Sequence, residues 1–218
     1  MRPVIVTAGP LAAASANNIA LSQTVTGAGS VTINGSLASG GVATLDKPRQ
    51  VLITNVGNDS GITFTVAGTT YGGASVSQTV QGTSGSTVAT TVDFATVTSI
   101  TTSGSTSVSG ITVGTNGVAG SSWVRLDDWA PAIWTVQVDV SGTINYSVQT
   151  TMDDPNDPTN PVTIPNVQWV SCSDSNVVSQ STNKYGASTG ASRYVRILVN
   201  SGTGTATATI LQSSNGPV

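Results

Sequence analysis

Acidic side chains are densest in the loop Asp153-Asp154-Pro155-Asn156-Asp157, where they could act as ligands for a hard cation. Calcium takes six to eight oxygen ligands, and Asp and Asn on a tight loop can supply several of them. The EF-hand spacing is absent, and no glutamate can close a cage because all ten acidic residues are aspartates. Asp and Asn beside proline also form turns without any ion. We therefore expect a turn and no resident metal, with Asp153, Asp154 and Asp157 as the ligands if calcium does bind.

A second cluster, near the middle of the chain, contains Trp123, Asp127, Asp128, Trp129 and Trp134. Aspartate pairs beside tryptophan suggest sugar binding, or hydrolysis of a sugar bond flanked by two carboxylates. Adjacent residues of a strand point to opposite faces, so Asp127 and Asp128 would share a site only if the backbone turns there. Tryptophans near a domain boundary more often anchor a contact. We interpret Trp123, Trp129 and Trp134 as interaction residues, with sugar binding as the alternative.

The side chains most used in enzyme chemistry are absent or isolated. The chain has no histidine, no glutamate and one cysteine, Cys172. A serine nucleophile would therefore lack a histidine base. Gly-x-Gly spacings such as Gly27-Ala28-Gly29 are not followed by a helical pattern, so they do not predict a phosphate or dinucleotide site. We expect no enzyme activity and no cofactor.

The composition predicts a folded protein with a weakly charged surface. Charged residues are 8% of the chain, against about 25% in ordinary globular proteins. Serine, threonine and asparagine must therefore cover much of the surface, and such a surface can be buried at small electrostatic cost. The seven basic residues are scattered, which disfavours nucleic acid. No segment approaches the roughly 20 apolar residues of a membrane span, and we expect no membrane segment.

Short alternating segments recur along most of the chain, separated by turns rich in glycine. This rhythm is typical of all-β sandwiches and barrels. No amphipathic stretch long enough for a stable helix interrupts it. We predict two tandem antiparallel β-sandwich or jelly-roll-like modules, residues 25–120 and 121–218, preceded by an extended N-terminal arm over residues 1–24. The clearest strand patterns are 30–34, 41–45, 49–54, 62–67, 75–80, 88–92, 95–100, 107–113, 134–140, 143–150, 193–199 and 205–211.

Two adjacent pairs of these patterns suggest hairpins, and the two halves of the chain resemble each other. Residues 134–140 and 143–150 flank a Ser-Gly turn, and residues 193–199 and 205–211 flank Asn200-Ser201-Gly202-Thr203-Gly204. The segments 62–66, 96–100 and 109–113 of the first half match 144–148, 193–199 and 207–211 of the second. A duplication explains this match, and convergent low-complexity β sequence is the alternative.

Three segments resemble virion structural proteins of tailed bacteriophages: Arg49–Val66, Ser121–Asp127 and Tyr146–Pro155. The resemblance is to head decoration, or cement, proteins. It implies β-sandwich or jelly-roll modules on the capsid surface of a virion and offers no catalytic residues. The partners it implies are the major capsid protein and other copies of this chain, in a homo-oligomer such as a dimer or trimer.

On this interpretation the arm and the first module contact the shell or sister subunits, and Arg2, Val4 and Ile5 are interaction residues. Extended arms can add a strand to a neighbour. We expect removal of residues 1–20 to abolish particle binding and leave the β fold intact. The alternatives are a tail or fibre component and a carbohydrate-binding or adhesin module.

Overall fold

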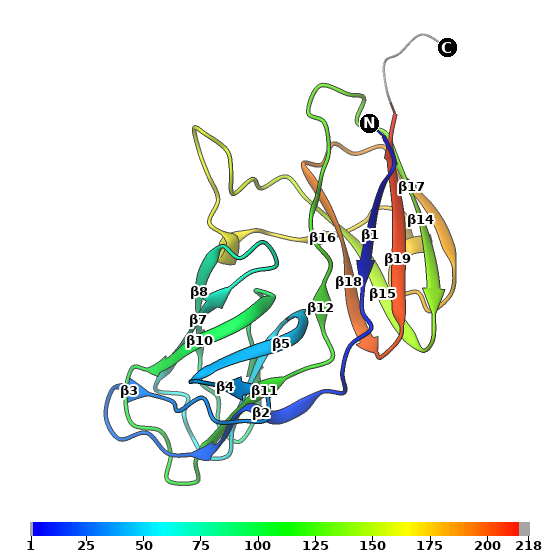
Figure 1. The fold of residues 1–218 in the computed structure, drawn as a ribbon. Coiled ribbons are helices and arrows are strands. Elements are labelled where there is room, and N and C mark those ends of the chain that lie inside the picture. The colour runs from blue at the N-terminus through cyan, green and yellow to red at the C-terminus, as the bar shows by residue number, and fades with distance from the viewer. Residues whose placement is uncertain (1, 214–218) are drawn as a thin grey trace. The chain divides into compact units, whose positions relative to one another are not determined.

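A computed structural model describes residues 2–213, and their regular structure is almost entirely antiparallel β-sheet (Figure 1). The helical elements of this range are two 3-10 helices of three residues each, η1 (Ile164–Asn166) and η2 (Ser175–Val177). The all-β prediction is confirmed. The chain divides into two compact units. We call Ala13–Asn116 the N-terminal unit, and the C-terminal unit combines the segment up to Ala12 with the segment from Gly117 onward.

The N-terminal unit contains two antiparallel sheets, with strand orders β2-β11-β6-β9 and β4-β5-β10-β7-β8; β3 pairs with β10 beside the second. Alternate residues of β6 and β7 are buried, as period-2 alternation predicts. The strands are β2 (Ser15–Gln23), β3 (Gly29–Ser30), β4 (Ala38–Ser39), β5 (Val42–Arg49), β6 (Val51–Asn55), β7 (Thr63–Thr69), β8 (Ser75–Gln81), β9 (Thr87–Ala89), β10 (Phe94–Thr102) and β11 (Ile111–Thr115).

The C-terminal unit also contains two antiparallel sheets, with strand orders β1-β19-β14-β17 and β12-β18-β15-β16. The short strand β13 pairs with β18 on the same side as β12. The strands are β1 (Val4–Ala8), β12 (Ala119–Gly120), β13 (Val124–Arg125), β14 (Trp134–Ser141), β15 (Ile144–Thr151), β16 (Val170–Ser171), β17 (Lys184–Ser188), β18 (Tyr194–Gly202) and β19 (Thr205–Gln212).

The two units share one strand order. Apart from β3, β4 and β13, each unit has eight strands, which can be numbered first to eighth in chain order. In both units one sheet has the order first-eighth-third-sixth, and the other has the order second-seventh-fourth-fifth. The segments matched in the sequence fall at equivalent places: β7 and β15 are the fourth strands, β10 and β18 the seventh, and β11 and β19 the eighth. The internal resemblance of the sequence therefore follows the strand order.

The predicted arm is incorporated into both units, so its prediction is wrong for the described residues. β1 pairs along its whole length with β19, from Val4–Ile210 to Ala8–Ala206, and β2 pairs with β11. Two features explain why the sequence pattern did not predict these strands. β1 has only five residues, and the pairing of β2 contains register shifts that break its alternation. The first strand of the C-terminal unit thus precedes the whole N-terminal unit in sequence.

The strands of both predicted hairpins form, but they do not pair with each other. β14 lies in one sheet of the C-terminal unit and β15 in the other, and the same is true of β19 and β18. The two turns instead contact one another, because the backbone N–H groups of Thr203 and Gly204 donate to the Thr143 carbonyl at 3.0 and 2.8 Å. A Cβ on Gly204 would lie 2.5 Å from the Ser141 carbonyl oxygen, so this turn requires glycine.

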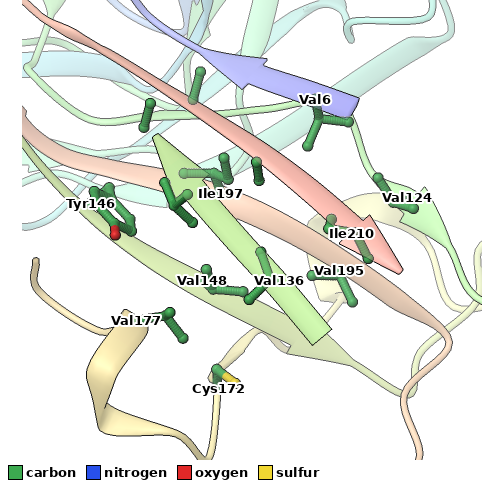
Figure 2. Packing of buried hydrophobic residues seen from close by; sticks show 14 of the residues in the cluster. Val6, Val124, Val136, Tyr146, Val148, Cys172, Val177, Val195, Ile197 and Ile210 are labelled. Carbon is green, nitrogen blue, oxygen red and sulfur yellow. The ribbon is translucent and has the colours of Figure 1, made fainter. Parts of the chain in front are cut away.

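The core of the C-terminal unit lies between its two sheets (Figure 2). Val6 of β1, Val136 of β14 and Ile210 of β19 enter it from one sheet, and Val148 and Ile197 enter from the other. Trp134 and Tyr146 are its largest members, and both are fully buried. Burial raises the pKa of the Tyr146 hydroxyl to about 12, with a further contribution from the charge of Asp139. Cys172, also in this cluster, is a free thiol whose pKa is raised by burial.

Candidate interaction surfaces

The central strand β18 carries polar and aromatic side chains on the side that faces away from the core. Val195 and Ile197 are in the core, whereas Tyr194 and Arg196 alternate with them. Both outward side chains are nevertheless only 6% exposed. Other residues therefore cover this face of the sheet.

Two tryptophans supply much of that cover. The rings of Trp123 and Trp169 meet edge to face at 4.9 Å, and Trp123 also meets Tyr194 at 5.8 Å. The Arg196 guanidinium lies over the Trp169 ring at 4.2 Å, and its Nε donates to Gln149 at 3.0 Å. Cation–π contacts of this kind contribute up to about 2 kcal/mol when they are desolvated. The cluster holds the loops that contain Trp123 and Trp169 against the sheet.

The acidic loop joins this cluster through arginines. The Asp154 carboxylate accepts from the Tyr194 hydroxyl at 2.9 Å and pairs with Arg193 at 3.2 Å and Arg125 at 3.3 Å. Burial would raise the pKa of Asp154, but the hydrogen bonds from Asn156 and Tyr194 and the two arginine charges together lower it. Asp157 lies 2.7 Å from Arg193. These contacts close the loop on itself and on the start of β18.

Arginine therefore provides positive charge where the sequence suggested calcium ligands. Asp154 and Asp157 share Arg193, and Asp153 accepts from the Gln168 N–H at 2.6 Å. In the part of the chain that the structure describes, no three Cys, His or acidic side chains are grouped to hold a metal ion. The arrangement matches a turn stabilised by ion pairs.

The ion pairs predict a titration at low pH. Hydrogen bonds from the backbone of Asn160 and Thr159, followed by the Arg193 contact, lower the pKa of Asp157 to about 2. A carboxylate with a lowered pKa stabilises the fold above its unfolded pKa of about 4, and that stabilisation disappears as the pH falls through the folded value. We expect the loop to lose its contacts between about pH 4 and about pH 2.

This titration can be followed through the amide resonances of Thr159 and Asn160, whose N–H groups bind Asp157. The expected midpoint is near pH 2. Arg193→Gln should raise the midpoint only part of the way to the ordinary aspartate value, because the backbone N–H groups of Thr159 and Asn160 still bind Asp157. A wild-type midpoint at the ordinary aspartate value would show that the pairing does not hold in solution.

Trp129 differs from the other tryptophans because its side chain is 93% exposed. Its loop is nevertheless tied down. The Asp127 carboxylate accepts from the Trp129 N–H at 2.9 Å, and the buried side-chain amide of Gln212 bonds both the N–H and the carbonyl of Asp127. Asp128 pairs with Arg125 at 3.0 Å. Residues 125–129 line a shallow, open depression. The backbone does turn here, but it directs the two aspartates to different partners.

The sheet β1-β19-β14-β17 has a bare outer face, which we call the exposed sheet face. Its register places outward side chains in four rows across the strands. Ile5 is 67% exposed, Tyr185 63% and Leu211 43%. The remaining side chains are neutral except for Asp139. The rows are Leu211, Thr135, Ala187; Ile5, Thr209, Gln137, Tyr185; Thr7, Thr207, Asp139; and Thr205, Ser141.

The predicted interaction residues therefore fall in different environments. Trp134 is fully buried in the core, so its assignment as an interaction residue is wrong: it points inward at the start of β14. Trp123 is half-buried in the aromatic cluster, and Trp129 is exposed. Of the N-terminal residues, Ile5 lies on the exposed sheet face and Val4 packs partly against the core. Arg2 is exposed just before β1.

Sequence reasoning missed Trp169, Tyr194 and the arginines around them. The alternation of residues 193–199 does predict that Tyr194 and Arg196 share one face. Nothing local indicates that Trp169, about 25 residues earlier, covers that face, because the contact depends on how the intervening loop folds back.

No family model, curated protein or solved structure matches this chain. Within residues 2–213 no helix is long and apolar enough to cross a membrane.

Proposed function

We propose that this chain is a virion structural protein of a tailed bacteriophage, a head decoration protein that binds the major capsid protein and other copies of itself on the capsid surface. The observation that carries the proposal is the exposed sheet face of the C-terminal unit. Eleven of its twelve outward side chains are neutral, and three are large and apolar. A protein that must remain bound to neighbours needs a surface of this kind, because burying it removes few charges from water.

We further propose that each unit is a jelly roll and that the two arose by duplication. The shared order of eight strands, first-eighth-third-sixth facing second-seventh-fourth-fifth, supports this. Jelly rolls pack two four-stranded sheets and recur in viral capsid proteins and lectins. Fold alone does not establish function, and the virion proposal therefore rests on the exposed sheet face.

Sugar binding fits the Trp129 depression less well. Its two carboxylates are already engaged, Asp127 by the Trp129 N–H and Asp128 by Arg125. A sugar hydroxyl would have to displace these partners or donate to a carboxylate lone pair that they do not occupy.

The copy number of the protein in purified virions tests the proposal. Quantitative mass spectrometry should find hundreds of copies, on the scale of the major capsid protein, because decoration proteins occupy sites repeated over the shell. A dozen copies or fewer would instead indicate a tail, fibre or portal component. Absence from the particle would overturn the virion assignment.

A further inference from the structure

We propose that the exposed sheet face of the C-terminal unit is a self-association surface, at which two copies of this chain pack sheet against sheet. The proposal deepens the function proposed above by naming the surface used and its occupant. Two sheets packed in this way lie about 10 Å apart with interdigitating side chains.

Exposed apolar side chains are concentrated on and beside this face. Eleven large hydrophobic side chains are exposed in the described residues, and five of them lie on or beside this face. Ile5, Leu211 and Tyr185 belong to the face, and Ile133 immediately precedes β14, with its carbonyl bonded to the Ser213 N–H. Trp129 lies in the loop that leads into Ile133. Apolar side chains gathered in this way mark interaction sites.

Within the C-terminal unit, no described residue covers this sheet face, where Ile5 is 67% and Tyr185 63% exposed. The outer face of the other sheet of the same unit is covered, and Tyr194 and Arg196 there are 6% exposed beneath Trp123 and Trp169. The two sheets share one core yet differ on their outer sides. The outer face of the second sheet is used for contacts within the unit. The exposed sheet face makes no such contacts with described residues of the unit, and its apolar side chains therefore suggest contact with another molecule.

The charge and hydrogen-bonding groups of the face favour a second copy of this chain as its occupant. The face bears a single charge, Asp139, whose carboxylate accepts weakly from Gln137 at 3.2 Å, so it selects neither a cationic nor an anionic partner. Apart from this carboxylate, its polar groups are the hydroxyls of threonines, Ser141 and Tyr185 and the Gln137 amide, each able to donate and to accept. Such a face complements itself, as a two-fold contact between identical surfaces requires.

A charge-swap experiment on the full chain tests the proposal. Thr209 lies between Ile5 and Gln137 in the row that ends at Tyr185. Thr209→Asp and Thr209→Lys, studied separately, each place like charges on both copies, and we expect association to weaken roughly 100-fold or more. An equimolar mixture of the two variants should restore association. Sedimentation velocity over a concentration series measures all three samples.

Thr79→Asp is the matched control, because Thr79 is an exposed threonine on β8 of the N-terminal unit. It should leave association unchanged, and circular dichroism should show every variant folded. Wild-type protein that remains monomeric overturns the proposal. So does association that survives both Thr209 variants, or that the mixture fails to restore. Because the readout is in solution and uses no virions, its failure is distinguishable from failure of the virion assignment.

Discussion

Replacing Trp134 by alanine will destabilise the C-terminal unit by about 3–5 kcal/mol, the usual cost of removing a large aromatic side chain from a core. Trp134 is fully buried, and its strand β14 is hydrogen-bonded on both sides, to β19 and β17. The cavity left behind cannot close without moving a strand held by two ladders. Denaturant unfolding, followed by hydrogen exchange in β14 and β19, measures the loss.

Trp129→Ala is the matched control, because it removes the same side chain from a position that is 93% exposed. Its effect on the free energy of unfolding should stay within about 0.5 kcal/mol. Equal losses from the two substitutions would contradict the placement of Trp134 in the core. The N-terminal unit, Ala13–Asn116, should retain its exchange protection in both variants.

Val6→Asp will destabilise the C-terminal unit by about 3 kcal/mol or more, because it places an unpaired charge in the core. Val6 is 7% exposed and lies opposite Ala208 of β19. Ile5→Asp, one residue earlier on the same strand, places the same charge on a side chain that is 67% exposed. It should leave the fold stable while weakening self-association. Hydrogen exchange at Ala208 and Ile210 compares the two variants.

If neither substitution lowers the free energy of unfolding, β1 is not part of the sheet. The N-terminal segment would then be an extended arm, as the sequence predicted. The structure also changes the expectation for removal of residues 1–20. That deletion takes away Val6 and Ala8 from one core, and Ile19 and Ala20 are buried in the N-terminal unit. Loss of particle binding after the deletion would therefore reflect unfolding and could not be assigned to an arm.

Period-2 alternation was sufficient to predict most strands. The predicted segments 134–140 and 205–211 correspond to β14 and β19, because each has one face in the core and one in solvent. It missed β17 and the two-residue strands β4, β12, β13 and β16, and it also failed for β1 and β2. The former is five residues long, and the latter contains irregular pairing that disturbs the pattern.

Alternation carries no information about which strand is the neighbour. β14 and β15 follow one another across a two-residue turn, as hairpin strands do, yet they lie in different sheets. The pattern of buried residues is the same whether a strand pairs with its predecessor or crosses to the opposite sheet. Pairing is decided by the packing of the whole unit.

The fate of individual polar and aromatic residues depends equally on tertiary structure. Trp129 and Trp134 are five residues apart, and one is exposed while the other is the largest side chain in the core. Asp154 lies in an acidic loop of the kind that can bind calcium, but its carboxylate forms an ion pair with Arg193, which is distant in sequence. The amino-acid sequence specified an all-β chain with weakly charged faces, because composition and alternation are local properties. Which face remains bare and which is covered was decided by contacts between residues far apart in the chain.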